Sequence, residues 1–274
     1  MADHLTLARP IVVEFFGLPG VGKSHATRLL AARLAAAGIA TRSAALIINH
    51  ELSGWRRVLY KCGICGGELV RGPRRAWRLA QTLVRTGQRN RLEVVRLFYN
   101  WLVLEGVVRR ARTRHAVEVL DEGLFQILWS VGLAGRDGAI GEFTSIISDG
   151  AGSSLPMPDV LVVVDAPLEI ILERLTVRGS RDSRVDRMNN PERRQALLRG
   201  ADLLSEVLSE EVGLVGGCFG PALRRLRTDD PQALGADVEA LASEVVSLAG
   251  DERTVLSRGP KLSQRDFVSS SSRR

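Results

Sequence analysis

Lysine and cysteine are both scarce in this chain, which has 274 residues and only three of each. Three cysteines in a chain of this size exclude the disulfide framework of a small secreted domain. Cys62 and Cys65 have the spacing of half a zinc site, but no second cysteine pair exists. His50 and His115 could complete such a site only by folding nearby. A turn with two thiols is therefore the favoured interpretation, with zinc or redox chemistry as the alternative.

Long hydrophobic runs are also missing. No apolar run approaches the roughly 18 residues that cross a bilayer. The first residues include an acid, Asp3, and no basic segment, and the first apolar run continues into a glycine loop, so we expect no signal peptide. The hydrophobic fraction of 45% and the charged fraction of 25% are typical of a soluble globular protein. These features predict a cytoplasmic protein without a membrane span.

Because lysine is scarce, arginine carries nearly all of the positive charge, and the formal net charge is +7. Arginine suits bidentate contacts with phosphates and carboxylates, so anionic metabolites, nucleic acid and membrane surfaces are all candidate partners. No basic stretch is interleaved with aromatics in the manner of single-strand-binding proteins. The sequence therefore argues against a nucleic-acid partner.

One motif is specific: the loop GLPGVGKS, from Gly17 to Ser24. It follows an apolar run, 11–16, that reads as a buried strand, and it precedes a helical pattern from Ala26 to Ala37. Strand, loop and helix form the context in which G-x-x-x-x-G-K-[ST] binds phosphate. The sequence thus predicts a phosphate-binding loop, or P-loop, rather than an ordinary glycine-rich turn.

The chemistry of this loop explains its residues. Glycines allow the backbone to turn with its amides pointing inward, and the positive end of the following helix faces the same place. Lys23 supplies a charge for the outer phosphates, and the Ser24 hydroxyl can ligate Mg²⁺. The predicted nucleotide-binding residues of the loop are Gly17, Gly20, Val21, Gly22, Lys23, Ser24 and His25.

Strands and helices are expected to alternate along the rest of the chain, which predicts an α/β fold with a parallel sheet. Further strands are expected at 41–49, 116–120, 159–165 and 222–227. Helices are expected within 52–114, interrupted at 62–67 and at Gly72-Pro73, and at 124–133, 143–148, 168–177, 191–211 and 231–249. Three tryptophans of the long helical stretch are assigned to the core: Trp55, Trp77 and Trp101. Arginine is dense in this stretch, and we expect a few of these side chains to face a binding cleft.

Two polar segments carry further candidate residues. Asp121 and Glu122 follow the third predicted strand, where a Mg²⁺-organising carboxylate belongs in a P-loop protein. The alternative is that Asp121 caps the next helix. The second segment, 178–187, repeats arginine every third residue. It predicts a lid whose arginines reach the migrating phosphoryl group, with a solvated charged loop as the alternative.

Three features resemble the nucleoside and nucleoside monophosphate kinases, most of all thymidylate kinase. The first is the P-loop. The second is the strand-end acid Asp121, followed here by Glu122 where thymidylate kinases carry arginine. The third is the run PDVLVVVDAP, 158–167, followed by Glu173-Arg174 and Arg178-Gly179. The resemblance covers roughly residues 10–249.

This resemblance implies an α/β P-loop three-layer sandwich with a five-stranded parallel sheet in the order 2-3-1-4-5. The kinase domain would span 1–249, with a helical acceptor-side region at 52–114 and a lid at 178–190. Residues 250–274 are polar and basic, and we expect a disordered tail. ATP with Mg²⁺ would be the phosphoryl donor, and kinases of this branch are often homodimers.

The resemblance also assigns roles to single residues. Lys23 and Ser24 would take phosphate and metal, with Asp121 organising the metal. Arg178 would lie against adenine, and Arg181 or Arg184 would meet the transferring phosphate. The loop at 228–229 would neighbour the base.

The sequence departs from thymidylate kinases beyond the second strand, where it reads His50-Glu51-Leu52 instead of their Arg-Glu-Pro. Glu51 or Glu122 is the candidate acid or base for the acceptor. We predict an ATP-dependent phosphotransferase that acts on a small-molecule acceptor, such as a nucleoside monophosphate. The alternatives are a P-loop ATPase or nucleotide-binding regulatory protein with a protein or nucleic-acid partner, and a degenerate kinase that binds nucleotide without transferring phosphate.

Overall fold

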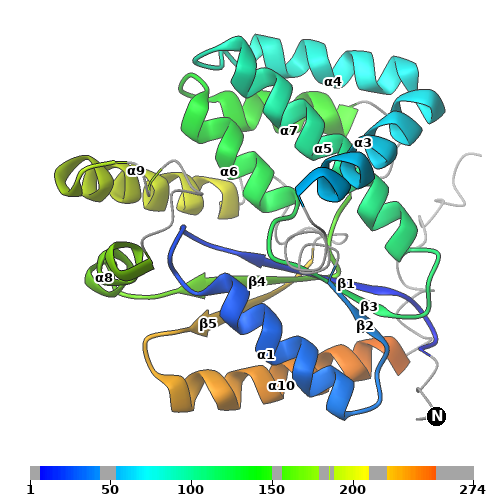
Figure 1. The fold of residues 1–274 in the computed structure, drawn as a ribbon, viewed down its shortest axis with the longest axis vertical. Helices are drawn as coiled ribbons and strands as arrows, with labels where there is room; N and C mark the ends of the chain where they lie inside the picture. The colour runs from blue at the N-terminus through cyan, green and yellow to red at the C-terminus, as the bar shows by residue number, and fades with distance from the viewer. Residues whose placement is uncertain are drawn as a thin grey trace, which may run out of the picture.

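A computed structural model describes residues 7–43, 54–149, 156–178, 185, 188–209 and 221–250. Five parallel strands form one sheet in the order β2-β3-β1-β4-β5 (Figure 1). The strands are β1 (Ile11–Phe16), β2 (Thr41–Arg42), β3 (Val117–Leu120), β4 (Val160–Asp165) and β5 (Ala222–Arg227). The strand order confirms the prediction. Strand β1 is buried along its whole length, as its apolar run predicts for a parallel sheet that is covered on both faces.

Helices cover both faces of the sheet, which completes the predicted three-layer sandwich (Figure 1). One face carries α1 (Lys23–Ala36) and α10 (Pro231–Gly250), which contact each other and the strands. The other face carries α5 (Arg91–Ala111) and α6 (Leu124–Ala134), which contact β1. Helices α8 (Leu168–Arg178) and α9 (Asn190–Leu208) lie beside β4 and α6.

Three more helices stack on α5 and α6, away from the sheet: α3 (Gly54–Arg71), α4 (Pro73–Arg85) and α7 (Ala139–Asp149) (Figure 1). Aromatic contacts tie these layers together. The rings of Phe16 on β1 and Phe125 on α6 lie 6.1 Å apart, and those of Trp101 on α5 and Phe143 on α7 lie 5.3 Å apart. Within the predicted helical region after the second strand, α5 therefore covers the sheet, and α3 and α4 form a further layer on top of it.

The predicted interruption at 62–67 is wrong, because α3 runs through it without a break. Glycine disfavours helix by about 1 kcal/mol relative to alanine. Here Ile64 packs so closely onto α5 that a Cβ on Gly106 would lie 2.3 Å from its Cγ2. Tertiary packing thus offsets the weak local preference. The predicted break at Gly72-Pro73 is confirmed, since Pro73 begins α4.

Other expectations also need correction. Trp55 and Trp77, which we assigned to the core, are 65% and 66% exposed, whereas Trp101 is buried as predicted. Helix α7 is longer than the expected helix at 143–148. The second strand begins at Thr41 as predicted, but most of its expected length, 44–49, lies outside the described residues.

Among the described residues, no helix is long and apolar enough to span a membrane.

Candidate functional site

The P-loop follows β1, the central strand, at the point where the sheet turns from β3 on one side to β4 on the other. In open α/β sheets this switch point is where ligands bind. Gly22 has φ +104° and caps α1, and Gly20 has φ +83°; both conformations favour glycine. A Cβ on Gly17 would lie 2.5 Å from the carbonyl oxygen of Val164 on β4. The three glycines are therefore required by the geometry of the loop.

The loop presents donors at the amino end of α1. No oxygen of the described residues accepts a hydrogen bond from the amides of Gly20, Gly22 or Ser24. The side chains of Ser24 and His25 are exposed. Free amides at a helix amino terminus, together with the helix dipole, bind anions. The loop thus has the backbone angles and the donors that phosphate binding would require.

The Lys23 side chain folds back over this loop. Its Nζ donates hydrogen bonds to the carbonyl oxygens of Gly17 at 2.6 Å and Leu18 at 3.1 Å. Lys23 also lies near Glu122, because its charge helps to lower the pKa of that carboxyl group. The ammonium group is therefore held by the P-loop and also acts electrostatically on an acid at the end of β3.

A clamp on the P-loop was missed by the sequence analysis. Arg174 on α8 donates from Nη1 to the carbonyl oxygen of Val21 at 3.1 Å and to Oγ1 of Thr228 at 2.9 Å. The Thr228 hydroxyl also donates to the Val21 carbonyl oxygen. Arg174 and Thr228 thus fix the loop from α8 and from the end of β5. The resemblance placed Thr228 near the base, and no local pattern indicates its contact with Val21.

The acids Asp121 and Glu122 lie at the same edge of the sheet as the P-loop. Strands β1 and β3 are parallel and pair Glu14 with Leu120, so their carboxyl ends meet at this edge. The Glu122 side chain is exposed at the surface, and the protein packed around it still desolvates its carboxylate in part. This desolvation and the Asp121 charge raise the pKa of Glu122, while three cations, Lys23, Lys61 and Arg96, oppose the rise.

Lys61 on α3 and Arg96 on α5 therefore belong to the surroundings of Glu122. Neither residue is among the site residues that the sequence motifs predict. The scarcity of lysine is the one sequence feature that points to Lys61. The chain has three lysines, and two of them, Lys23 and Lys61, act on the Glu122 carboxylate. Cations from α3 and α5, two helices of the arginine-rich region, thus act on an acid at the end of β3.

The buried Glu14 side chain of β1 accepts the hydrogen bonds at the amino end of α6. The alternative prediction gave this capping role to Asp121. Its Oε1 accepts hydrogen bonds from the amides of Phe125 at 2.8 Å and Gln126 at 3.2 Å. The cap residue itself is Gly123, where a Cβ would lie 2.3 Å from Oε2 of Glu14. Burial outweighs the amide donors and raises the pKa of Glu14 to about 8. Asp121 therefore does not cap α6.

Several predicted site residues cannot be compared with the structure. Glu51, Arg181 and Arg184 lie outside the described residues, as does most of the predicted lid. Arg178 is the last residue of α8, and its side chain is not described. At the far end of the lid, Asn189 caps α9 in a capping box with Glu192. The roles given to these residues remain predictions.

The two cysteines of the CxxC motif lie on a helix and not in a turn. Cys62 and Cys65 are free thiols on α3. Burial raises the pKa of Cys65, and burial together with Cys62 raises the pKa of Tyr99 to about 12. A raised thiol pKa disfavours the reactive thiolate. No group of three or more metal-ligating side chains occurs within the described part of the chain.

The donor set at the P-loop fits Mg²⁺. It comprises the exposed Ser24 hydroxyl at the start of α1 and the Asp121 carboxylate after β3. Both are hard oxygen donors, and Mg²⁺ in nucleotide sites takes only one or two protein ligands beside phosphates and water. The residues present therefore suit this metal.

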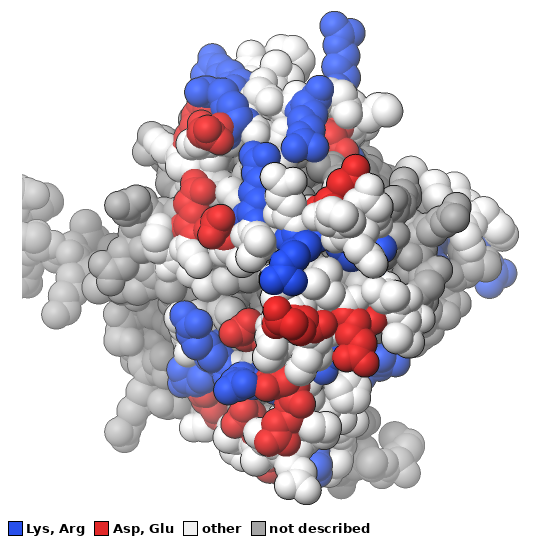
Figure 2. All heavy atoms as spheres, turned by 90° about the vertical axis from the view of Figure 1, so that its left-hand side faces the viewer, with Lys and Arg blue, Asp and Glu red and all other residues white. Residues whose placement is uncertain are grey.

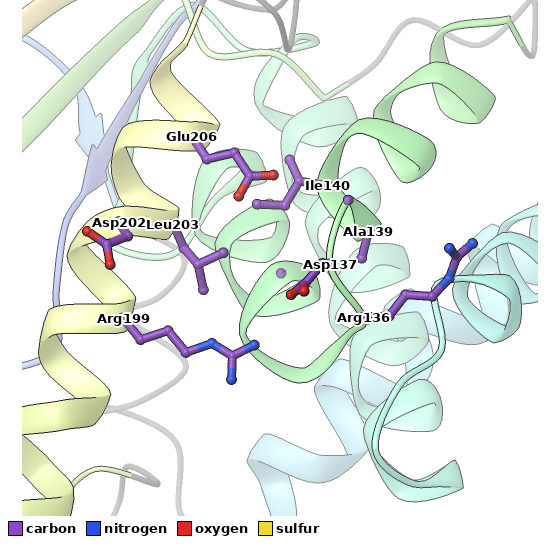
Figure 3. Close-up of a pocket in the computed structure, with 10 residues that line it drawn as sticks. Arg136, Asp137, Ala139, Ile140, Arg199, Asp202, Leu203 and Glu206 are labelled. Atoms are coloured by element: carbon purple, nitrogen blue, oxygen red, sulfur yellow. The ribbon is translucent and has the colours of Figure 1, made fainter.

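A separate cavity of about 270 Å³ lies between α9 and the turn that joins α6 to α7. Figure 3 shows Arg199 reaching from α9 toward this turn, which carries Arg136 and Asp137. Asp202 and Glu206 complete a lining of mixed charge. None of these side chains belongs to the P-loop or to the acid pair, so this cavity is not part of the candidate site.

The sequence matches no protein-family model and no curated protein. Among solved structures, the fold is similar to that of deoxyadenosine kinase from M. mycoides, determined with the products dCMP and a flexible dCDP bound. The identity is 12%, the TM-score is 0.46, and the match covers 86% of this chain and all of that one. Similarity at this level supports no conclusion about activity.

Proposed function

We propose that the chain is an ATP-dependent phosphotransferase that moves the γ-phosphoryl group of ATP to a small-molecule acceptor. One observation carries this proposal. The P-loop follows the central strand with Lys23 and with three amides that no described residue accepts a hydrogen bond from, and an acid pair follows the neighbouring strand at the same sheet edge. Such an arrangement holds a triphosphate and its metal and leaves the γ-phosphate facing a second substrate.

In this reaction we assign the following roles to the chain's own residues. Loop amides and Lys23 would bind the β- and γ-phosphates, whose oxygens would replace the carbonyl oxygens of Gly17 and Leu18 as partners of Nζ. Ser24 and Asp121 would hold Mg²⁺, which when bound neutralises phosphate charge. Glu122 would accept the proton of the acceptor, since its raised pKa brings it closer to that of an effective base at neutral pH.

The remaining roles rest on the resemblance to thymidylate kinases. Arg178 would lie against adenine, and Arg181 and Arg184 would neutralise the transferring phosphoryl group in a dry site. Glu51 is the second candidate for the acceptor-side acid or base.

The acceptor we propose carries an anionic group of its own, as a nucleoside monophosphate does. Lys61 and Arg96 support this choice, because they bring two cations close to Glu122 in addition to Lys23. A neutral acceptor would not need them. An anionic acceptor is the property that the protein would share with thymidylate kinases.

The first test is a screen for ADP release from ATP and Mg²⁺ across acceptor classes, with thymidine monophosphate first. Lys23→Ala should lower turnover at least about 100-fold while the fold is retained, because the charge on the outer phosphates is lost. Arg33→Ala, at the other end of the same helix, is the matched control. Undiminished transfer by Lys23→Ala would rule out the assignment. ATP hydrolysis that only a protein or nucleic-acid partner stimulates would favour the regulatory alternative.

A further inference from the structure

Helix α3 exposes its apolar face and buries its one acid. Ile64 and Glu68 are buried on the side that faces α5. At helical spacing, the opposite side carries Trp55, Leu59, Cys62, Gly66 and Leu69. Trp55 is 65% and Leu59 60% exposed. An ordinary surface helix shows the reverse pattern, with its apolar stripe facing the core.

Helix α4, which contacts α3, also exposes apolar residues. Trp77 and Val84 are exposed beside three exposed arginines, Arg74, Arg78 and Arg85, while Leu79 and Leu83 are buried. One residue, Gly72, separates α4 from α3, and the two helices contact each other. We call the exposed residues of 54–85 the α3–α4 surface.

The α3–α4 surface holds most of the exposed apolar bulk of the molecule. The described chain exposes twelve large hydrophobic residues, and eight of them belong to this surface. They are Trp55, Val58, Leu59, Tyr60, Leu69, Val70, Trp77 and Val84. Single exposed apolar residues are normal, but a concentration of this kind marks an interaction site.

The solvent-accessible charge of the same segment is positive. Residues 54–85 contain eight basic residues and one acid, Glu68. The Glu68 side chain is 2% exposed and paired with Arg71, Arg75 and Arg109, so the surface offers no accessible carboxylate. By contrast, the face shown in Figure 2 intersperses acidic and basic side chains.

We propose that the α3–α4 surface docks the protein on an anionic lipid bilayer. Helices that lie in the membrane interface combine tryptophan and aliphatic residues with arginines and little acid. Tryptophan rings settle at headgroup depth, the aliphatic side chains enter the acyl boundary, and guanidinium groups pair with lipid phosphates. The proposal is independent of the phosphotransfer reaction, since the variants that test it change no residue placed at the P-loop or beside the acid pair.

Two other occupants fit these residues less well. A second copy of the chain, packed symmetrically through the same surface, would bring the exposed arginines Arg74, Arg78 and Arg85 of both copies together without a counter-charge. Nucleic acid would satisfy the arginines but leave Val58, Leu59, Val70 and Val84 without an apolar partner. A bilayer with anionic headgroups supplies both the charge and the apolar phase.

The test is a sedimentation assay of the full chain with vesicles of phosphatidylcholine alone and with vesicles containing phosphatidylglycerol. We expect binding to the anionic vesicles that weakens as salt is raised. Trp55→Gln/Trp77→Gln should bind at least about tenfold more weakly, and so should Arg74→Gln/Arg78→Gln. Tryptophan emission should shift to the blue on binding. Trp55 and Trp77 would report this shift, because Trp101 and Trp129 are already buried.

Matched controls test whether binding depends on the α3–α4 surface or on exposed apolar and basic residues anywhere on the protein. Val177→Gln/Leu198→Gln removes exposed apolar residues elsewhere, and Arg33→Gln/Arg194→Gln removes exposed cations elsewhere. Both controls should bind as the wild type does. No binding to anionic vesicles, or equal binding by the tryptophan variant, would overturn the proposal. Concentration-dependent self-association that the tryptophan variant abolishes, without vesicle binding, would assign the surface to a second copy. Binding to polyglutamate but not to vesicles would assign it to an acidic protein.

Discussion

Two of the chain's three lysines act on one carboxylate, that of Glu122. Elsewhere arginine carries the positive charge, so the use of lysine here points to a site where a compact, mobile charge is needed. Asp121 and burial raise the pKa of Glu122, and Lys23 and Lys61 oppose them. These opposing effects together set the pKa of Glu122, and a substitution that removes one of them should shift it.

Lys61→Met should raise the pKa of Glu122, because the substitution removes a charge that stabilises the carboxylate. The acidic limb of the pH profile of kcat/KM should move to higher pH, and Asp121→Asn should move it to lower pH. A carbon-13 NMR titration of the Glu122 carboxyl measures the same shift without an acceptor. Arg33→Gln, far along α1, is the control and should leave this titration unchanged. Identical titrations of Lys61→Met and wild type would contradict the placement of Lys61.

At the scale of elements, α3, α4 and α5 are joined through Glu68. Its carboxylate bonds Arg109 of α5 and Arg75 of α4, and Arg71 of α3 lies 3.6 Å away. Burial alone would raise the pKa of Glu68, but these arginines together hold it below its ordinary value. The helical layer thus depends on one buried acid among partly exposed cations.

Glu68→Gln should lower the free energy of unfolding by roughly 2 kcal/mol, since charge-assisted hydrogen bonds to a buried carboxylate are lost. The control is Glu239→Gln, whose partner Arg33 and whose own side chain are both more than half exposed. Such pairs contribute less than about 1 kcal/mol. Urea unfolding of the three proteins compares the two losses. Equal losses would show that the Glu68 network is not a special link between the helices.

The whole molecule is organised by β1, which leads to the P-loop and also carries Glu14. Glu14 reaches from the sheet to α6 and abuts Gly123, the residue after the acid pair. One buried side chain therefore connects the phosphate side of the site with its acid side. Because burial raises its pKa to about 8, its proton uptake couples to the stability of the fold.

The sign of this coupling follows from the proton balance. Between the ordinary pKa of 4.5 and about 8, the folded state keeps a proton on Glu14 that the unfolded state has lost. Its contribution to stability is thus complete below pH 4.5 and is lost as the pH rises through about 8. The slope approaches about 1.4 kcal/mol per pH unit within this window.

Glu14→Gln should remove this slope, because glutamine keeps the shape and does not ionise. Urea unfolding at several pH values from 5 to 9 measures the stability difference between variant and wild type. The difference should move in favour of the variant as the pH rises. A constant difference would mean that Glu14 is ionised in the fold throughout this range, stabilised by the amides of α6.

Local patterns sufficed for the P-loop and the buried strands, and the resemblance to P-loop kinases supplied the sheet order. The Gly17–Ser24 motif predicts its own conformation, because its glycines fix the backbone geometry of the loop. The apolar runs of β1 and β4 predict strands, because a parallel sheet buries its strands on both faces. The acid after β3 followed in the same way, since parallel strands end at one edge of a sheet.

Long-range contacts decided the rest. Ile64 against Gly106 kept α3 helical through its glycines, Arg174 and Thr228 clamped the P-loop from distant elements, and Glu14 replaced Asp121 as the cap of α6. Trp55 and Trp77 have the helical spacing of core residues, and only the packing of α3 and α4 turned them outward. The amino-acid sequence alone determined the glycine loop, the buried strands and the acid after β3, because short motifs encode them. Which residues surround this loop and this acid was decided in three dimensions, because burial and charge depend on partners far away along the chain.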